Sequence, residues 1–183
     1  GSGTAVKVGT YAQLERLWPY EAVSASYEIT VEDGCITVCG YDERGCAQGL
    51  YQLEDRMTQI RAPYLAKGVT QYAPAFSPRM VHSGYGQEQY PDPHLAAIAH
   101  AGMDAILYFV KDVDRTDVGY QDFNNPIRIA AKYGLDVYAY SYYHSERNPE
   151  DPDAYEHYNS TYGRLFQYCP DLKGVVLMGE SCA

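Results

Sequence analysis

The chain has 183 residues, of which 46% are hydrophobic and 21% are charged, a composition typical of a globular protein of one or two domains. Its formal net charge is −10 and its Lys and Arg residues form no cluster, which argues against nucleic-acid binding, because affinity for phosphate backbones depends on clustered cations. No apolar run approaches the roughly 18 residues of a membrane span, so no membrane partner is expected.

The five cysteines are odd in number and lack the spacing of a disulfide framework, which favours free thiols, a reducing compartment and a cytoplasmic location. Cys35 and Cys39 have no CxxC partner, so no metal site is expected, and no cofactor is expected either. The leading Gly-Ser-Gly is typical of an expression-tag remnant, so the natural N-terminus is expected to lie elsewhere.

Residues 1–72 are predicted to form a small α+β domain that begins with a helix. Thr10 and Gln13 fit a capping box, and the apolar residues that follow predict a short amphipathic helix as far as Trp18.

A β-hairpin and a second helix are expected to complete this domain. Apolar residues alternate over 27–31 and 35–38, and the Asp-Gly pair between these runs is a strong hairpin signal. Apolar residues then recur at helical spacing and predict one stripe that packs on the hairpin, made of Leu50, Leu53, Met57 and Ile60.

Residues 69–78 are predicted to be irregular and to contain the domain boundary, and residues 73–183 are predicted to repeat strand and helix. The expected strands are the apolar runs 80–82, 105–110, 137–140 and 175–178. Three expected helices begin with a side-chain cap before a proline, at Asp92-Pro93, Asn125-Pro126 and Asp151-Pro152. In the third, the expected buried face consists of Tyr155, Tyr158, Tyr162 and Phe166.

Strand, helix and strand at roughly thirty residues per unit is the βαβ pattern, which predicts the α/β class and a parallel sheet. Four strands and three helices are half of an eight-stranded (β/α)8 barrel, or most of a small doubly wound sheet. No Gly-rich phosphate loop follows any of the strands, so a nucleotide-binding fold is not favoured.

The last predicted strand carries the most informative residue. Its four apolar residues lie between Gly174 and Gly179, so the strand is expected to be buried on both faces, and Glu180 is the first charged residue after it. Barrel enzymes keep their catalytic residues at the C-terminal ends of their strands. Burying a lone carboxylate in this position costs free energy unless the group serves in catalysis or binding or has a charged or hydrogen-bonding partner. This cost favours a functional role for Glu180.

Other polar residues flank the predicted strands and are candidate site residues: Arg79, His82, Lys111, Asp112, Tyr143 and His144. The carboxyl ends of parallel strands share one edge, so most of these side chains are expected to form a polar pocket with Glu180. Structural roles remain open for each of them. The histidines suit hydrogen-bonded positions in the fold, Lys111 and Asp112 suit a solvated loop, and Arg79 suits an ion pair at the domain junction.

Two stretches, GCAQGLYQLEDRM at 45–57 and FSPRMVHSGY at 76–85, resemble the junction found in family 20 glycoside hydrolases and family 67 α-glucuronidases. In those families a small α+β domain precedes a (β/α)8 barrel whose first strand opens with a Pro-Arg pair. The resemblance implies a carbohydrate-active barrel truncated after strand four, with Glu180 as general acid and Arg79 as a sugar contact. Family 20 has an Asp-Glu pair where this chain has Gly179 and Glu180, so its substrate-assisted mechanism is not implied.

Cleavage of a glycosidic bond needs an acid at the leaving oxygen and a second carboxylate as nucleophile or base. The second is expected on a later strand, since Asp112 on strand two is a weak substitute, so this chain alone is expected to have little hydrolase activity. Two alternatives stay open: a non-catalytic module that binds carbohydrate or protein, and a metal-dependent hydrolase using His82, His144 and Glu180. Open sheet edges of a half barrel also predict homo-oligomers.

Overall fold

The computed structural model describes residues 3–82, 90–111, 115–116, 119–141 and 147–177. The chain divides into two compact units, Gly1–Ser77 and Pro78–Ala183. Every helix in the described ranges is too short or too polar to cross a lipid bilayer.

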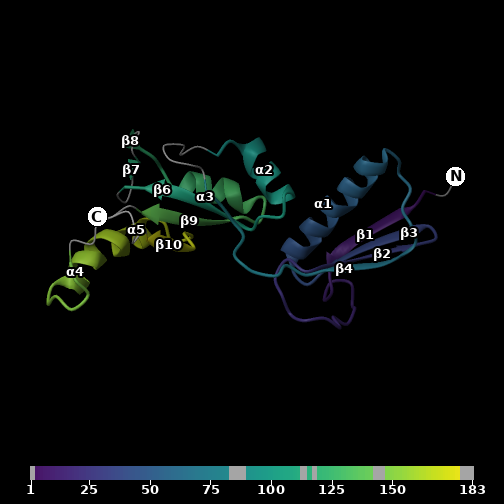
Figure 1. Ribbon diagram of the computed structural model, residues 1–183, viewed down its shortest axis with the longest axis horizontal. Coiled ribbons are helices and arrows are strands. Elements are labelled where there is room, and N and C mark those ends of the chain that lie inside the picture. The colour runs from purple at the N-terminus through teal and green to yellow at the C-terminus, as the bar shows by residue number, and fades with distance from the viewer. Residues whose placement is uncertain (1–2, 83–89, 112–114, 117–118, 142–146, 178–183) are drawn as a thin grey trace. The chain divides into compact units, whose positions relative to one another are not determined.

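The first unit is a four-stranded sheet with one helix across one face (Figure 1). Its elements are β1 (Ala5–Thr10), β2 (Tyr27–Glu32), β3 (Cys35–Gly40), α1 (Glu43–Ile60) and β4 (Gly68–Tyr72). The strand order is β1-β3-β2-β4, in which β2 pairs antiparallel with β3 and β4, and β1 pairs parallel with β3. Gly34 takes φ of 73° in the turn between β2 and β3, which confirms the predicted hairpin.

The core of this unit forms between the helix and the inward face of the hairpin. Its buried members are Tyr27, Ile29, Val31, Ile36, Val38 and Leu53. The face that α1 buries is Gly45, Gly49 and Leu53, with Met57 packed beside them, so the predicted stripe was wrong at Leu50 (39% exposed) and Ile60 (55% exposed). The two glycines explain the difference, because they let the helix backbone approach the sheet on a face that carries few apolar side chains.

The close approach at Gly45 predicts that a single methyl group is destabilising there. A Cβ at Gly45 would overlap the backbone carbonyl oxygen of Ser26, which cannot rotate away as a side chain could. We expect Gly45→Ala to lower the free energy of unfolding by about 1–3 kcal/mol, because such overpacking exceeds the roughly 1 kcal/mol that alanine gains in helix propensity. Urea unfolding followed by the fluorescence of Trp18, the single tryptophan, measures it. Glu54→Ala, on the exposed face of α1, is the control, and equal stability of the two variants would contradict the prediction.

The helix predicted after Thr10 does not form, because residues 11–15 make consecutive turns. The capping-box bonds are present: the Thr10 amide donates to Gln13 Oε1 (2.8 Å) and the Gln13 amide donates to Thr10 Oγ1 (3.3 Å). Glu15 then takes a left-handed φ of 52°, and Pro19 follows, so the chain cannot propagate a helix from this start.

Two strands of this unit were not predicted. β1 and β4 are the two edges of the sheet, and most of their side chains are exposed, including Val6 (52%) and Val69 (62%). An edge strand can form without a buried face, so its sequence carries a weak hydrophobic signal. For the same reason, part of the segment expected to be irregular is the strand β4.

The second unit is built on a parallel sheet of order β10-β9-β6-β5. Its elements are β5 (Met80–His82), α2 (Asp92–His100), β6 (Ala105–Val110), the short pair β7 (Arg115–Thr116) and β8 (Gly119–Tyr120), α3 (Asn124–Ala131), β9 (Asp136–Ser141), α4 (Ala154–Tyr158), the π-helical turn η1 (Asn159–Gly163), α5 (Arg164–Tyr168) and β10 (Gly174–Leu177). The predicted α/β alternation and parallel pairing are thereby confirmed for the described strands.

Helices α2 and α3 lie next to each other in this unit (Figure 1). Leu95, Ile98 and Ala99 of α2 are buried as predicted, and so are Ile127 and Ala130 of α3. Helix α3 also contacts β9, so its buried residues pack against the sheet.

The predicted side-chain caps are absent at α2, α3 and α4, whose N-cap residues are Pro91, Phe123 and Asp153. At α2 the reason is visible, because Asp92 is already helical and its carboxylate accepts hydrogen bonds from Lys132 Nζ (3.1 Å) and Tyr133 Oη (2.9 Å). These two bonds join α2 to the end of α3 and lower the pKa of Asp92.

The third helix buries its predicted aromatic face only in part, since Tyr158 and Tyr162 are half-buried, which corrects the prediction. Tyr155 is 83% exposed and Phe166 is 41% exposed, whereas Ala154, Leu165 and Cys169 are buried. The turn η1 divides this helix, and a π-helical turn contains more residues than an α-helical one, so the 3.6-residue spacing does not carry through. Burial raises the pKa of the Cys169 thiol to about 11.

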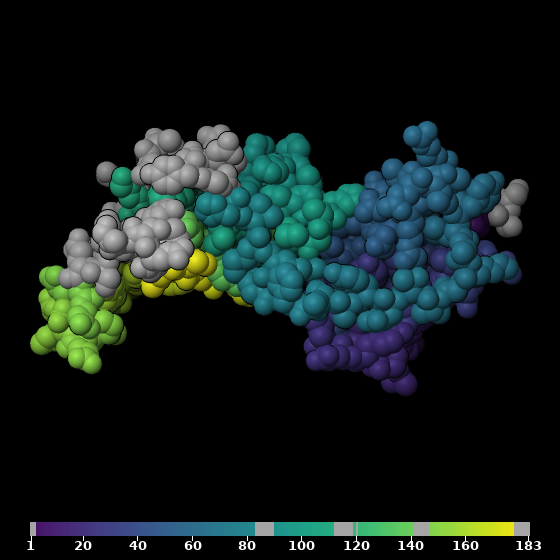
Figure 2. Space-filling view, in the orientation of Figure 1, coloured from purple at the N-terminus to yellow at the C-terminus, as the bar shows by residue number. Residues whose placement is uncertain are grey.

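The strand β10 is not buried on both faces as expected. Gly174, Val175 and Val176 are half-buried, and Leu177 is 63% exposed. In the described part of the chain β10 pairs with β9 alone and forms the edge of the sheet. Figure 2 shows atoms of this last described segment, at the yellow end of the scale, on the visible surface.

Candidate functional site

The parallel registers bring three strand ends to one row at the C-terminal edge of the sheet. Val110 of β6 aligns with Ser141 of β9, and Ser141 aligns with Leu177 of β10. Lys111 directly follows β6, and its side chain is exposed at this edge. The described ends of β6, β9 and β10 therefore lie at neighbouring positions along this edge.

His82 ends β5 and aligns with Leu107 of β6. Its imidazole meets the ring of Tyr140 on β9 edge to face, with centroids 4.7 Å apart and an interplanar angle of 73°. The centroids of the Tyr140 and Phe109 rings lie 6.2 Å apart. His82, Phe109 and Tyr140 thus form an aromatic row near the strand ends, with the exposed imidazole as its most polar member.

Arg79 lies at the opposite, N-terminal edge of the same sheet. It precedes β5, is 8% exposed, and its Nε lies 3.2 Å from Oδ2 of Asp104, which is 5% exposed and precedes β6. The other carboxylate oxygen accepts a hydrogen bond from the Arg79 amide (2.5 Å), and the Asp104 amide donates to the Arg79 carbonyl (3.0 Å). The structure therefore does not bring Arg79 together with His82 and Lys111.

The other predicted site residues, Asp112, Tyr143, His144 and Glu180, lie outside the described residues. Among the residues that are described, no three His, Cys, Asp or Glu side chains gather in a way that could hold a metal ion.

A hollow of about 550 Å³ follows β9 in the chain and was not predicted. Its lining residues are Pro149, Ala154, Tyr155, Tyr158, Asn159 and Gly163. The Tyr155 ring is 83% exposed, and the side chain of Asn159, in the π-helical turn, is exposed as well. An open aromatic ring beside an amide can contact both the apolar and the polar groups of a ligand.

Hydrogen bonds hold the segment before this hollow against α4. Tyr158 Oη donates to the Arg147 carbonyl (2.5 Å), and Arg147 Nε donates to Asp153 Oδ2 (2.9 Å). The bond from Arg147 lowers the pKa of Asp153. The sequence signal for this hollow was its tyrosines, which helical spacing had assigned to the core.

No protein-family model and no curated protein sequence matches this chain. Solved structures do match it. A GH138 enzyme targeting pectin rhamnogalacturonan II gives a TM-score of 0.66 at 12% identity, covering 96% of this chain and 26% of that chain. A beta-N-acetylhexosaminidase gives a TM-score of 0.61 at 16% identity, covering 87% of this chain and 48% of that chain. CpGH84B gives a TM-score of 0.60 at 12% identity, covering 91% of this chain and 32% of that chain.

The chain has a glycoside-hydrolase-like fold. The resemblance predicted from the two junction stretches is thereby supported at the level of the fold. The chain spans about a quarter to a half of the length of these three structures.

Proposed function

We propose that this chain is the N-terminal portion of a glycoside hydrolase whose substrate is an oligosaccharide or another glycoside. The observation that carries the proposal is the glycoside-hydrolase-like fold, which extends over 87% to 96% of the chain in the three structures above. The second unit would then be the first half of a (β/α)8 barrel. Its four parallel strands, which follow one another in the sheet in chain order, support this proposal.

The substrate would bind at the C-terminal edge of the sheet, with Glu180 as the general acid. Glu180 follows the last described residue of β10, Leu177, by three positions. A carboxylic acid there would protonate the leaving oxygen. A second carboxylate, from a segment outside this chain, would either attack the anomeric carbon as nucleophile or activate the attacking water as base.

Two described residues of this edge, His82 and Lys111, are proposed sugar contacts, and so are three residues that follow β6 and β9 in the sequence: Asp112, Tyr143 and His144. An imidazole or an ammonium group can donate hydrogen bonds to sugar hydroxyls, and the ring of Tyr140 beside His82 offers an apolar surface. We assign Arg79 a different role from the one that the family resemblance implied. Its buried ion pair with Asp104 holds the start of β5 against the start of β6.

A panel of chromogenic aryl glycosides and glucuronides tests this function. The assay compares the present chain with a version extended through the natural downstream sequence. We expect hydrolysis only by the extended version, because one catalytic carboxylate is not sufficient. Saturable sugar binding without turnover in either version would favour a carbohydrate-binding module, and neither binding nor turnover would contradict the proposal.

The hollow beside α4 predicts a contribution to sugar affinity. Tyr155→Ala removes an exposed ring, so we expect oligosaccharide affinity to fall about 3- to 10-fold, for a contact worth roughly 1 kcal/mol, with little change in stability. Phe166→Ala is the control, since Phe166 is an exposed aromatic residue of the same helical segment that does not line the hollow. Isothermal titration with an oligosaccharide substrate measures both variants, and equal losses would assign the effect to general surface change.

A further inference from the structure

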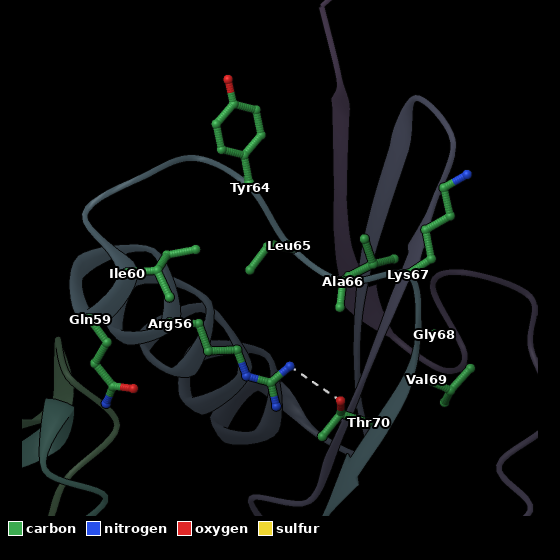
Figure 3. Close-up of a pocket in the computed structure, with 11 residues that line it drawn as sticks. Arg56, Gln59, Ile60, Tyr64, Leu65, Ala66, Lys67, Gly68, Val69 and Thr70 are labelled. Atoms are coloured by element: carbon green, nitrogen blue, oxygen red, sulfur yellow. Dashed lines mark hydrogen bonds between the residues drawn. The ribbon is translucent and has the colours of Figure 1, made fainter.

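The first unit contains a cavity of about 330 Å³ between the C-terminal turns of α1 and the strand β4 (Figure 3). Its lining includes Arg56 and Ile60 of α1, Leu65 and Lys67 of the connecting segment, and Val69 and Thr70 of β4. This volume is in the range of small-molecule sites.

Arg56 is the charged group at the centre of this cavity. Its side chain reaches from α1 toward β4, where Nη1 donates to Thr70 Oγ1 at 3.2 Å (Figure 3). A guanidinium group has five N–H donors, and within the described residues that bond is the one that Arg56 makes. The remaining donors of this half-buried group can therefore bind a ligand.

The charge of the cavity favours an anion. Among the described residues that line it, none is Asp or Glu, although the whole chain has a net charge of −10. Lys67 adds a second cation at the rim, and its ammonium lies 2.5 Å from the exposed carboxylate of Asp33 on the hairpin. Arg56 thus supplies the charge inside the cavity, and a carboxylate is the anion that fits its planar, two-pronged donor geometry best.

The walls of the cavity are apolar and open. Ile60 of α1 is 55% exposed, and Leu65, in the segment between α1 and β4, is half-buried against the core. A ligand that satisfies both features has a carboxylate for Arg56 and an apolar face for these side chains. The ring of a uronic acid combines the two.

We propose that this cavity binds the uronic-acid residue of a carbohydrate, with its carboxylate on Arg56 and its ring against Ile60 and Leu65. The choice of a sugar rests on the proposed function, whereas the choice of a carboxylate rests on the cavity itself. The cavity lies within the first unit and the strand-end residues belong to the second, and the role that we assign to the cavity is to retain a substrate, not to cleave it.

Titration of the isotope-labelled full chain with glucuronic acid and with glucose tests this proposal by NMR. The two sugars differ by the carboxylate at C6. We expect glucuronic acid to shift the amide signals of Gly68, Val69 and Thr70 saturably, with a Kd on the order of 1 mM for a ligand of this size, and glucose to leave them unchanged.

Variants then assign the effect to one side chain. We expect Arg56→Met to weaken glucuronic acid binding at least tenfold and Arg56→Lys, which keeps the charge, to weaken it less. Lys7→Met is the control, because it removes one exposed positive charge on β1, outside the cavity lining.

Equal shifts with glucose, unchanged affinity in Arg56→Met, or binding of inorganic phosphate without binding of glucuronic acid would overturn the inference. An inactive extended protein that still binds glucuronic acid through Arg56 would contradict the proposed hydrolase and support this site.

Discussion

Replacing Glu180 with Gln in the extended protein is expected to reduce the hydrolysis of glycosides by about 10²- to 10⁴-fold, the range typical of a lost general acid. The amide has nearly the shape of the carboxylic acid, but it cannot transfer a proton to the leaving oxygen. Binding of the sugar should change little, because glutamine keeps an acceptor and donors at the same place. Steady-state kinetics on the substrate found in the panel measure this loss.

The choice of leaving group makes this experiment specific for an acid. A strongly acidic phenol departs without full protonation, so its glycosides should lose less activity in Glu180→Gln than glycosides of alcohols or weakly acidic phenols. The neighbouring substitution Ser181→Ala serves as the control and should leave both rates close to normal. If both substrate classes lost activity equally in Glu180→Gln, Glu180 would not be the acid.

Asp104→Ala is expected to lower the free energy of unfolding of the second unit by about 3–5 kcal/mol. The substitution would leave the Arg79 guanidinium buried without its counter-ion, and it would also remove the acceptor of the Arg79 amide. The matched control is Asp153→Ala, which breaks a shorter but exposed ion pair with Arg147 and should cost at most about 1 kcal/mol. Urea unfolding followed by circular dichroism, with hydrogen exchange of the β6 amides, measures both variants.

The double variant Arg79→Met, Asp104→Leu separates charge from hydrogen bonding. It removes both buried charges, so it should recover part of the stability that Asp104→Ala loses. A loss of about 1–3 kcal/mol should remain, because the Arg79 amide still lacks its acceptor. A cost of Asp104→Ala no larger than that of Asp153→Ala would show that the buried pair does not hold the two strands together. If Arg79→Met also weakened sugar binding in a folded protein, Arg79 would regain the role that the family resemblance implied.

The elements that could be predicted from the sequence are those whose pairing and burial produce a recognisable pattern of apolar residues or turn residues. β6 is apolar throughout because it lies between two strands, and the β2 and β3 hairpin carries alternation and an Asp-Gly turn. The strand β4 lacks such a pattern because it forms an edge. The face of α1 was misjudged since two of its contact residues are glycines, which hydrophobic spacing does not count.

The candidate site was predictable only where it follows a strand. His82 and Lys111 could be assigned to the C-terminal edge from the ends of two apolar runs. The ion pair of Arg79 with Asp104 joins residues that are 25 positions apart, one before β5 and one before β6. No local sequence motif predicts this pair. The cavity around Arg56 likewise depends on how α1 and β4 approach each other, which is a property of the folded unit.

The strand order of the second unit has a consequence for synthesis on the ribosome. β5, β6, β9 and β10 occupy successive places in the sheet, so each new strand can add to the one made just before it as the chain emerges. In the first unit β1 pairs with β3, and β4, the last strand made, pairs with β2, so its sheet is complete only when β4 has emerged. Co-translational folding should therefore proceed in one cooperative step for the first unit and strand by strand for the second, with the newest strand always at the growing edge.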